Sequence, residues 1–193
     1  MTIAENYPPQ VLSCLMNLLG THDTPRILTA LADDFDGSRE ELARRKLTAA
    51  QYRQGRERLK MASFLQYALP GALSIYYGDE AGMEGGKDPF NRRTYPWGRE
   101  DRELLAHYRR LGQLRQTQEA LRLGDIRFFC AEGGRLGFTR NYGGESLRIC
   151  INQGDEPWSV VPGKVLLGYR LDTHSAEELV LAAGGMCITK EEV

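Results

Sequence analysis

The chain has 193 residues, 41% of them hydrophobic and 26% charged, which is enough apolar material for one substantial core or two small ones. Its 25 basic and 26 acidic residues leave a net charge of −1, so no electrostatic attraction to nucleic acid or to an anionic membrane is expected. The apolar runs are too short to cross a bilayer and the first six residues lack the features of a signal peptide, so we expect a cytoplasmic protein with no membrane partner.

The first part of the chain alternates strand and helix patterns. An apolar run over residues 12–20 favours a buried strand that leads into a loop, although a short helix fits nearly as well. Thr24-Pro25-Arg26 then predicts the start of a short helix. Pro25 would lie in its first turn, where the missing N–H of proline costs nothing.

A capping box predicts the next helix. Ser38 lies three residues before Glu41, and the amphipathic stretch behind them runs to about residue 69, where Pro70-Gly71 ends it. The apolar run over residues 72–77 then indicates a second buried strand, with residues 78–80 as its exit loop.

The pattern changes from helical to strand-like near residue 121. A glycine-rich loop over residues 82–98 leads to Asp101, which can cap a helix. The apolar residues behind Asp101 keep helical spacing: Leu104, Leu105, Tyr108, Leu111 and Leu114. Further on, apolar residues alternate with a period of two, and Gly133-Gly134 and Gly143-Gly144 separate the runs as hairpin turns do. The last third of the chain is therefore predicted to be a small antiparallel β module.

The four cysteines give no sign of a metal site. Cys14, Cys130, Cys150 and Cys187 are scattered without a C-x-x-C pair. Cys130 and Cys150 both lie in strand-like runs and could face each other, but their positions do not establish a disulfide. We expect reduced, partly buried thiols, no metal and no cofactor.

Three motifs, in order along the chain, resemble the α-amylase family of glycoside hydrolases. Residues 17–26, NLLGTHDTPR, resemble the His-Asp motif after the seventh barrel strand in the neopullulanase and cyclomaltodextrinase branch. Residues 76–83, YYGDEAGM, resemble the eighth strand and its exit loop. Residues 88–98, which include DPFNRR and YPWG, resemble the substrate-side loop of the same branch.

The resemblance covers nearly the whole chain and implies an α+β fold. Residues 1–120 would form the helical tail of a (β/α)₈ barrel, and residues 121–193 a small antiparallel β-sandwich. A full barrel needs about 250 residues, so the barrel portion would be incomplete. The resemblance implies that the rest of the barrel, or a second copy in a homo-oligomer, covers it.

The resemblance also implies roles for the His-Asp motif. Asp23 would be the carboxylate that stabilises the transition state, and His22 would bind sugar hydroxyls beside it. Hydrogen bonds that tighten in the oxocarbenium-like transition state of a glycosidase lower the barrier. Without the downstream motifs, Asp23 is better explained as the cap of the helix that opens at Pro25.

Five further residues are implied to bind substrate or to shape the site. Asp88 and Arg92 would bind sugars further from the cleaved bond, or they form only a surface ion pair. Arg26 would orient a loop or a carboxylate in the barrel mouth, or it lies at the surface. Tyr77 and Trp97 could stack on sugars, although aromatic residues behind apolar runs more often belong to the core.

The two catalytic carboxylates of the family have no counterpart in the expected places. The family carries its nucleophilic Asp and its acid Glu on earlier strands. Gly168-x-Arg170-x-Asp172 imitates the G-x-R-x-D signature of the nucleophile, but it follows the His-Asp motif and lies in the β module. The resemblance thus implies a C-terminal fragment of an enzyme for α-glucans such as starch, maltodextrin, pullulan or cyclodextrin, inactive by itself.

Two rival interpretations belong to other classes. A metal-dependent phosphohydrolase also uses a His-Asp pair, but it needs further histidines, and the others here are His107 and His174. That interpretation fails on ligand count. A non-catalytic carbohydrate-binding or assembly module remains as the alternative.

Overall fold

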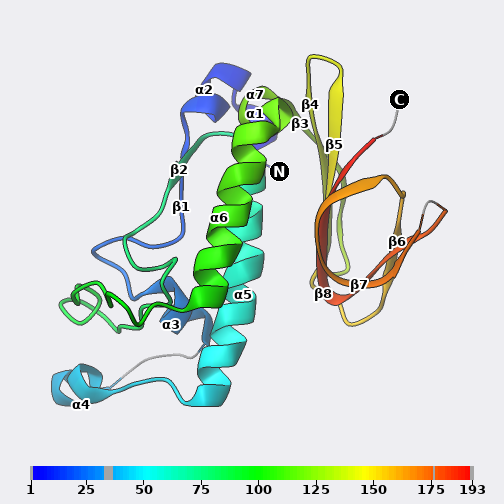
Figure 1. The fold of residues 1–193 in the computed structure, drawn as a ribbon. Helices are drawn as coiled ribbons and strands as arrows, with labels where there is room; N and C mark the ends of the chain where they lie inside the picture. The colour runs from blue at the N-terminus through cyan, green and yellow to red at the C-terminus, as the bar shows by residue number, and fades with distance from the viewer. Residues whose placement is uncertain (1, 33–36, 176, 192–193) are drawn as a thin grey trace. The chain divides into compact units, whose positions relative to one another are not determined.

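The computed structural model describes residues 2–32, 37–175 and 177–191 (Figure 1). Its elements in chain order are α1 Thr2–Asn6, α2 Pro9–Cys14, β1 Met16–Leu18, α3 Ile27–Ala32, α4 Arg39–Arg44, α5 Ala49–Ala68, β2 Ala72–Ser74, α6 Arg102–Thr117, α7 Glu119–Leu123, β3 Asp125–Glu132, β4 Arg135–Tyr142, β5 Glu145–Asn152, β6 Trp158–Val160, β7 Lys164–His174 and β8 Leu179–Lys190. The α+β class and the antiparallel β module are confirmed.

Contacts divide the chain into two compact units. Unit 1 comprises Met1–Leu15, Ala68–Ala72 and Leu114–Val193, and unit 2 comprises Met16–Tyr67 and Leu73–Gln113. The sequence predicts a division at residue 120, into a barrel part and a β domain. That division rests on the type of secondary structure and not on contacts, and it stays a prediction.

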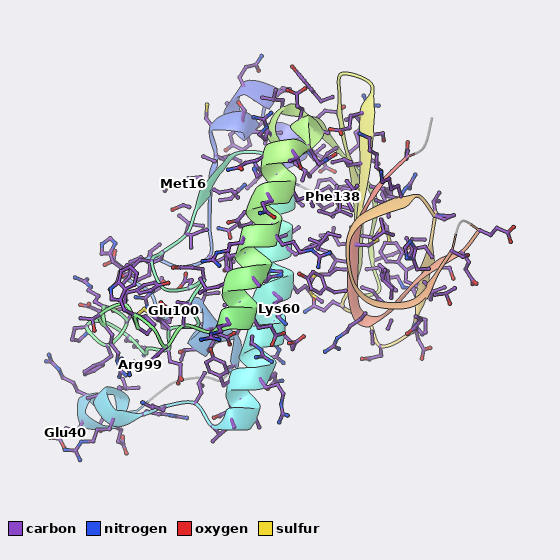
Figure 2. All side chains as sticks on the ribbon, viewed as in Figure 1. Met16, Glu40, Lys60, Arg99, Glu100 and Phe138 are labelled. Atoms are coloured by element: carbon purple, nitrogen blue, oxygen red, sulfur yellow. The ribbon has the colours of Figure 1, made fainter. Side chains whose placement is uncertain are left out.

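Unit 1 is built around one antiparallel sheet of six strands. Two hairpins connect β3 to β4 and β4 to β5. Both turns have glycine pairs at positive φ, 56° and 74° at Gly133 and Gly134, and 56° and 84° at Gly143 and Gly144. Such turns match the right-handed twist of the flanking strands, so the predicted hairpins are confirmed. Phe138 of β4, which Figure 2 labels, is fully buried, with a relative exposure of 0%.

Strand β8 lies in the middle of this sheet. One of its edges pairs with β5 near its C-terminal end and with β6 near its start, while the other edge pairs with β7. Gly184, at a φ of 73°, lies between the two halves of β8 and permits the bend there. The sheet curls (Figure 1), so the two layers of the predicted β-sandwich belong to one hydrogen-bonded sheet.

Two buried arginines hold the C-terminal end of α5 in unit 1. Arg140 donates to the main-chain carbonyls of Ala68, Gly124 and Asp125. Arg115 donates to the main-chain carbonyls of Leu69 and Gly71. The last carbonyls of a helix lack partners within the helix and favour a nearby cation. Burial, with Arg115 close by, lowers the pKa of Arg140 to about 10, so Arg140 remains charged at neutral pH.

Unit 2 contains most of α5 and α6. Helix α3 approaches the backbone of α5 at Gly55, where a Cβ atom would lie 2.7 Å from the Leu28 carbonyl oxygen and 2.8 Å from the Ala32 Cβ. Helix α6 begins behind Asp101, whose carboxylate accepts the N–H groups of Glu103 and Leu104 at 2.9 and 3.0 Å. The predicted cap of α6 is confirmed.

The structure corrects the elements predicted over residues 12–32. Of the strand expected over residues 12–20, only Met16–Leu18 form a strand, and the alternative of a short helix holds for the start of the run, where α2 extends to Cys14. Pro9 favours the first turn of α2, and the extended backbone of Leu15 ends it. Helix α3 begins at Ile27, so Pro25 precedes the helix instead of lying in its first turn.

The long helix predicted after residue 38 is two helices. The capping box of Ser38 and Glu41 is confirmed, but the helix that it starts, α4, ends at Arg44. Helix α5 begins behind a second box, in which the Thr48 N–H donates to Gln51 Oε1 at 2.9 Å and the Gln51 N–H donates to Thr48 Oγ1 at 3.3 Å. The signature T-x-x-Q is present in the sequence and indicates this start.

The strand predicted over residues 72–77 is shorter and more exposed than expected. β2 covers only Ala72–Ser74 and pairs with β1 in a two-stranded sheet. Gln66 of α5 donates to the carbonyls of Asn17 and Ser74, both at 2.9 Å. Apolar side chains of these segments remain exposed, and Met16 is 62% exposed. Figure 2 labels the Met16 side chain. A strand is buried only when neighbours cover its edges and faces, and a two-stranded ribbon does not supply them.

The four cysteines are free thiols. Cys130 and Cys150 do not face each other directly, because Gly137 of β4 lies between them in the register. Cys150 is instead opposite Cys187, and the hydrogen bond with Cys187 together with burial raises the pKa of the Cys150 thiol. Within the described ranges, no helix is both long and apolar enough to cross a membrane.

Candidate functional site

The His-Asp motif lies in the loop between β1 and α3, in unit 2. Contacts between Thr21 and Thr24 close this loop, with the Thr21 N–H donating to Thr24 Oγ1 at 3.1 Å. The Asp23 N–H donates to Thr21 Oγ1 at 3.2 Å. Because α3 begins at Ile27, Asp23 lies too far upstream to cap it, and the helix-cap interpretation of Asp23 is excluded.

Four of the residues implied by the resemblance lie together around this loop. His22 Nε2 is 3.2 Å from Asp23 Oδ2, and Arg92 Nη2 is 3.6 Å from Asp23 Oδ1. Arg92 Nε is 2.7 Å from Asp88 Oδ1. The Asp23 side chain is 70% exposed, so these ion pairs contribute at most about 1 kcal/mol each to stability. Replacing these contacts by hydrogen bonds to the hydroxyl groups of a ligand would therefore cost little free energy.

Asn91 lies within the DPFNRR motif, but the motif gave it no role of its own. Its side chain is completely buried, and Nδ2 donates to the carbonyl oxygens of His22 and Thr24, both at 2.7 Å. The next residue, Arg92, also donates from Nε to the His22 carbonyl at 3.2 Å. No pattern could have revealed these contacts, because their acceptors are main-chain atoms that any residue possesses.

Arg26 is buried beneath the loop. Its Nε donates to the Asn91 carbonyl at 2.7 Å, and its Nη1 donates to the Tyr77 carbonyl. Nη1 also lies 3.3 Å from Asp79 Oδ1. The guanidinium carbon lies 4.2 Å from the ring centroid of Tyr76 and 4.5 Å from that of Tyr77. A surface position for Arg26 is therefore excluded.

Asp79 is the buried carboxyl beside Arg26. Burial raises the pKa of Asp79 to about 6, and Arg26 opposes that shift by favouring the ionised form. Asp79 follows the strand-like run in the motif YYGDE. The Asp79 carboxyl contacts Arg26, which lies beneath the loop. It does not contact the exposed cluster of His22, Asp23, Asp88 and Arg92.

The two aromatic residues named from the sequence are both accessible. Tyr77 is partly exposed, and its hydroxyl donates to the Arg93 carbonyl at 2.8 Å. Trp97 is 81% exposed and lies against Tyr95, with ring centroids 4.6 Å apart and an interplanar angle of 51°. Neither residue belongs to a core. No group of three or more His, Cys, Asp or Glu side chains in the described part of the chain has the arrangement of a metal site.

Comparison with known proteins identifies the family. No protein-family model matches the chain. The chain is 40% identical over 167 residues to an amylopullulanase from Thermoanaerobacter thermohydrosulfuricus, and the aligned region covers 80% of this chain and 11% of that protein. It is 34% identical over 160 residues to a cyclomaltodextrinase from Geobacillus thermopakistaniensis, 81% of this chain and 24% of that protein. The crystal structure of a debranching enzyme from Nostoc punctiforme matches 97% of this chain and 36% of its own, with a TM-score of 0.74 and 30% identity. The chain belongs to the α-amylase family of glycoside hydrolases.

The match to the α-amylase family is partial in length. The chain spans 11% of the amylopullulanase and 24% of the cyclomaltodextrinase. Helices followed by an antiparallel sheet agree with the C-terminal part of such an enzyme.

Proposed function

We propose that this chain carries the part of an α-glucan-acting glycoside hydrolase that stabilises the transition state and binds neighbouring sugars. The substrate would be starch, maltodextrin, pullulan or cyclodextrin. The observation that carries the proposal is the exposed cluster in which His22, Asp23, Asp88 and Arg92 converge from two segments of unit 2. The names of the relatives, which include amylopullulanase and cyclomaltodextrinase, support this substrate class.

In this proposal, Asp23 accepts hydrogen bonds from hydroxyls of the sugar ring at the cleavage point. His22, whose Nε2 lies 3.2 Å from the Asp23 carboxylate, binds an adjacent hydroxyl of the same ring. As positive charge develops on the ring, hydrogen bonds to the Asp23 carboxylate strengthen and lower the barrier. Neither residue attacks the anomeric carbon or protonates the leaving group.

The remaining residues act around this centre. Asp88 and Arg92 bind sugars further from the cleaved bond, with carboxylate acceptors and guanidinium donors that match hydroxyl groups. The exposed rings of Tyr77 and Trp97 stack on sugar faces. Arg26, which is buried, acts only through the loop and the carboxyl that it holds.

The experiment has two arms, hydrolysis and binding. We expect no release of reducing sugar from maltohexaose, pullulan or β-cyclodextrin, because retaining chemistry needs a nucleophile and an acid that the motifs of this chain do not supply. We expect maltohexaose to shift the NMR signals of residues 21–24, and Asp23→Ala to weaken binding at least tenfold. Asp172→Ala, in the look-alike G-x-R-x-D motif, is the matched control and should bind as the wild type does. Equal binding by Asp23→Ala, or hydrolysis that Asp172→Ala abolishes, would overturn the assignment.

A carbohydrate-binding module without a catalytic role is the second candidate. The observation that favours it is Trp97, which packs against Tyr95 and still presents most of its surface to solvent. If the chain is such a module, Trp97→Ala will abolish maltohexaose binding while Asp23→Ala leaves it intact. The opposite order of effects supports the first proposal.

A further inference from the structure

We infer that Asn91 is a positioning residue whose buried amide holds the His22–Asp23 loop in the shape that a glucan needs. This inference rests on the proposed function of Asp23. It adds a residue that touches no substrate and acts through the main chain of the loop.

The hydrogen bonds of Asn91 bracket Asp23. Both protons of its Nδ2 are used, one for the His22 carbonyl and one for the Thr24 carbonyl, each at 2.7 Å. The bonds within the loop are longer, at 3.1 Å from the Thr21 N–H to Thr24 Oγ1 and 3.4 Å from the Thr24 N–H to the Thr21 carbonyl. The Arg92 Nε donates to the His22 carbonyl at 3.2 Å, so the two bonds from Asn91 are the shortest of those that hold the loop, and hydrogen bonds weaken with such lengthening.

The side-chain contacts of Asp23 cannot do the same work. Its contacts with His22 and Arg92 lie at 3.2 and 3.6 Å, and the Asp23 side chain is 70% exposed. Exposed contacts of this kind are weak and exchange with water. The direction in which the Asp23 carboxylate points is therefore set by the backbone on either side of it, which Asn91 holds.

Asn91 is itself fixed from below. Its carbonyl accepts the Arg26 Nε at 2.7 Å, and Arg26 is anchored to the Tyr77 carbonyl and to Asp79. The guanidinium lies against the rings of Tyr76 and Tyr77. A chain of buried contacts thus runs from Asp79 through Arg26 and Asn91 to the loop.

The identity of the side chain matters as well as its size. An amide turned the other way would place Oδ1 against two carbonyl oxygens, so the donor must face the loop. An aspartate has nearly the same shape but offers only acceptors when it is ionised. Asn91→Asp therefore replaces two attractive contacts by two repulsive ones.

The test measures loop order and glucan binding separately in the 193-residue chain. In Asn91→Asp, we expect the amide protons of residues 21–24 to exchange with solvent at least tenfold faster, while those in the middle of α5 are unchanged. We expect the affinity for maltohexaose, measured per folded molecule, to fall at least tenfold. Asn91→Ala, which removes the donor without adding charge, should give the same two effects if Asn91→Asp does not fold.

Asn152→Asp is the matched control. Asn152 is also fully buried, and its Nδ2 donates to the carbonyls of Glu156, Leu181 and Ala182 in unit 1. Its replacement should lower stability without changing exchange in residues 21–24. In the wild type, which needs no variant, the side-chain amide protons of Asn91 should exchange far more slowly than those of the exposed Asn6.

The outcomes separate this inference from the function on which it rests. Unchanged loop exchange in a folded Asn91 variant overturns the inference, and so does unchanged maltohexaose affinity when binding depends on Asp23. Fast exchange of the Asn91 side-chain amide in the wild type overturns it too. A loosened loop in a protein whose wild type binds no maltohexaose overturns the proposed function alone.

Discussion

Buried titratable side chains give single residues of this chain a measurable effect on stability. His107 of α6 is buried, and its Nε2 lies 2.9 Å from Ser63 Oγ of α5. Burial, together with the nearby charge of Lys60, lowers the pKa of His107 from 6.5 to about 4. The folded state therefore disfavours the imidazolium that the unfolded chain accepts readily.

We predict that His107 makes the free energy of unfolding fall as the pH decreases. Between about pH 6.5 and 4 the unfolded chain binds a proton at this residue and the folded chain does not, so stability is present above the unfolded pKa and is lost toward the folded one. The loss is about 3 kcal/mol at most. Urea unfolding from about pH 7.5 to about pH 4.5 should show a weaker pH dependence for His107→Gln than for the wild type.

The control for this experiment is His174→Gln, because His174 lies exposed in β7. It should retain the pH dependence of the wild type. The raised pKa of Asp79 acts in the opposite direction, since its protonated form is favoured in the folded state. The difference between variant and wild type, and not the absolute slope, therefore reports on His107. An identical slope in His107→Gln would show that the imidazole titrates normally.

Helix packing distinguishes two glycines at the scale of secondary-structure elements. A Cβ added to Gly55 of α5 would lie within 3 Å of atoms of α3, whereas a Cβ added to Gly112 of α6 would meet no atom within 4 Å outside its own helix backbone. Both glycines lie inside a helix, so replacing either by alanine should bring a similar gain in helix propensity. The two positions differ in the space that a side chain would find, because α3 lies against Gly55 and Gly112 is open.

We predict opposite effects for the two alanine variants. Gly55→Ala should destabilise the protein by about 1–3 kcal/mol, because its methyl group would overlap the Leu28 carbonyl and the Ala32 side chain. Gly112→Ala should stabilise it by about 0.5–1 kcal/mol through helix propensity. Equilibrium denaturation with urea measures both. A stabilising Gly55→Ala would mean that α3 can move away from α5 at little cost.

At the scale of the whole molecule, the ribbon of β1 and β2 leaves apolar surface exposed. Met16, Leu18, Ile75 and Tyr77 are all accessible to solvent. Exposed apolar surface beside unpaired strand edges favours association. We propose that a second copy of the chain, or the rest of the barrel that the resemblance implies, covers this surface.

We predict that the chain forms dimers or larger assemblies at micromolar concentration, as measured by sedimentation velocity. The double variant Met16→Lys and Ile75→Lys should shift the equilibrium toward monomer, because it places charges on the surface that would be buried. Val161→Lys, at an exposed apolar position of unit 1, is the control and should not. A wild-type monomer that unfolds cooperatively would rule out self-association and leave the family unchanged.

The sequence by itself determined the features that depend on residues close together in the chain. The caps at Ser38 and Asp101 join groups two or three residues apart, and the glycine pairs of the two hairpin turns are recognised for the same reason. The box at Thr48 was equally local, but the continuous amphipathic pattern around it concealed the break between α4 and α5. The motif order also indicated the α-amylase family, which the relatives confirm.

Only the tertiary structure decided which strands are buried and what supports the His-Asp loop. The apolar runs near β1 and β2 have the pattern that is typical of buried strands. Burial, however, depends on neighbouring strands and helices, and the residues of one run do not specify those neighbours. Arg26 meets Asp79 and Asn91 across 53 and 65 positions of sequence. Two of the contacts that join this group to the loop end on main-chain carbonyls, which carry no residue signature. The fold had to bring these groups together before their roles could be inferred.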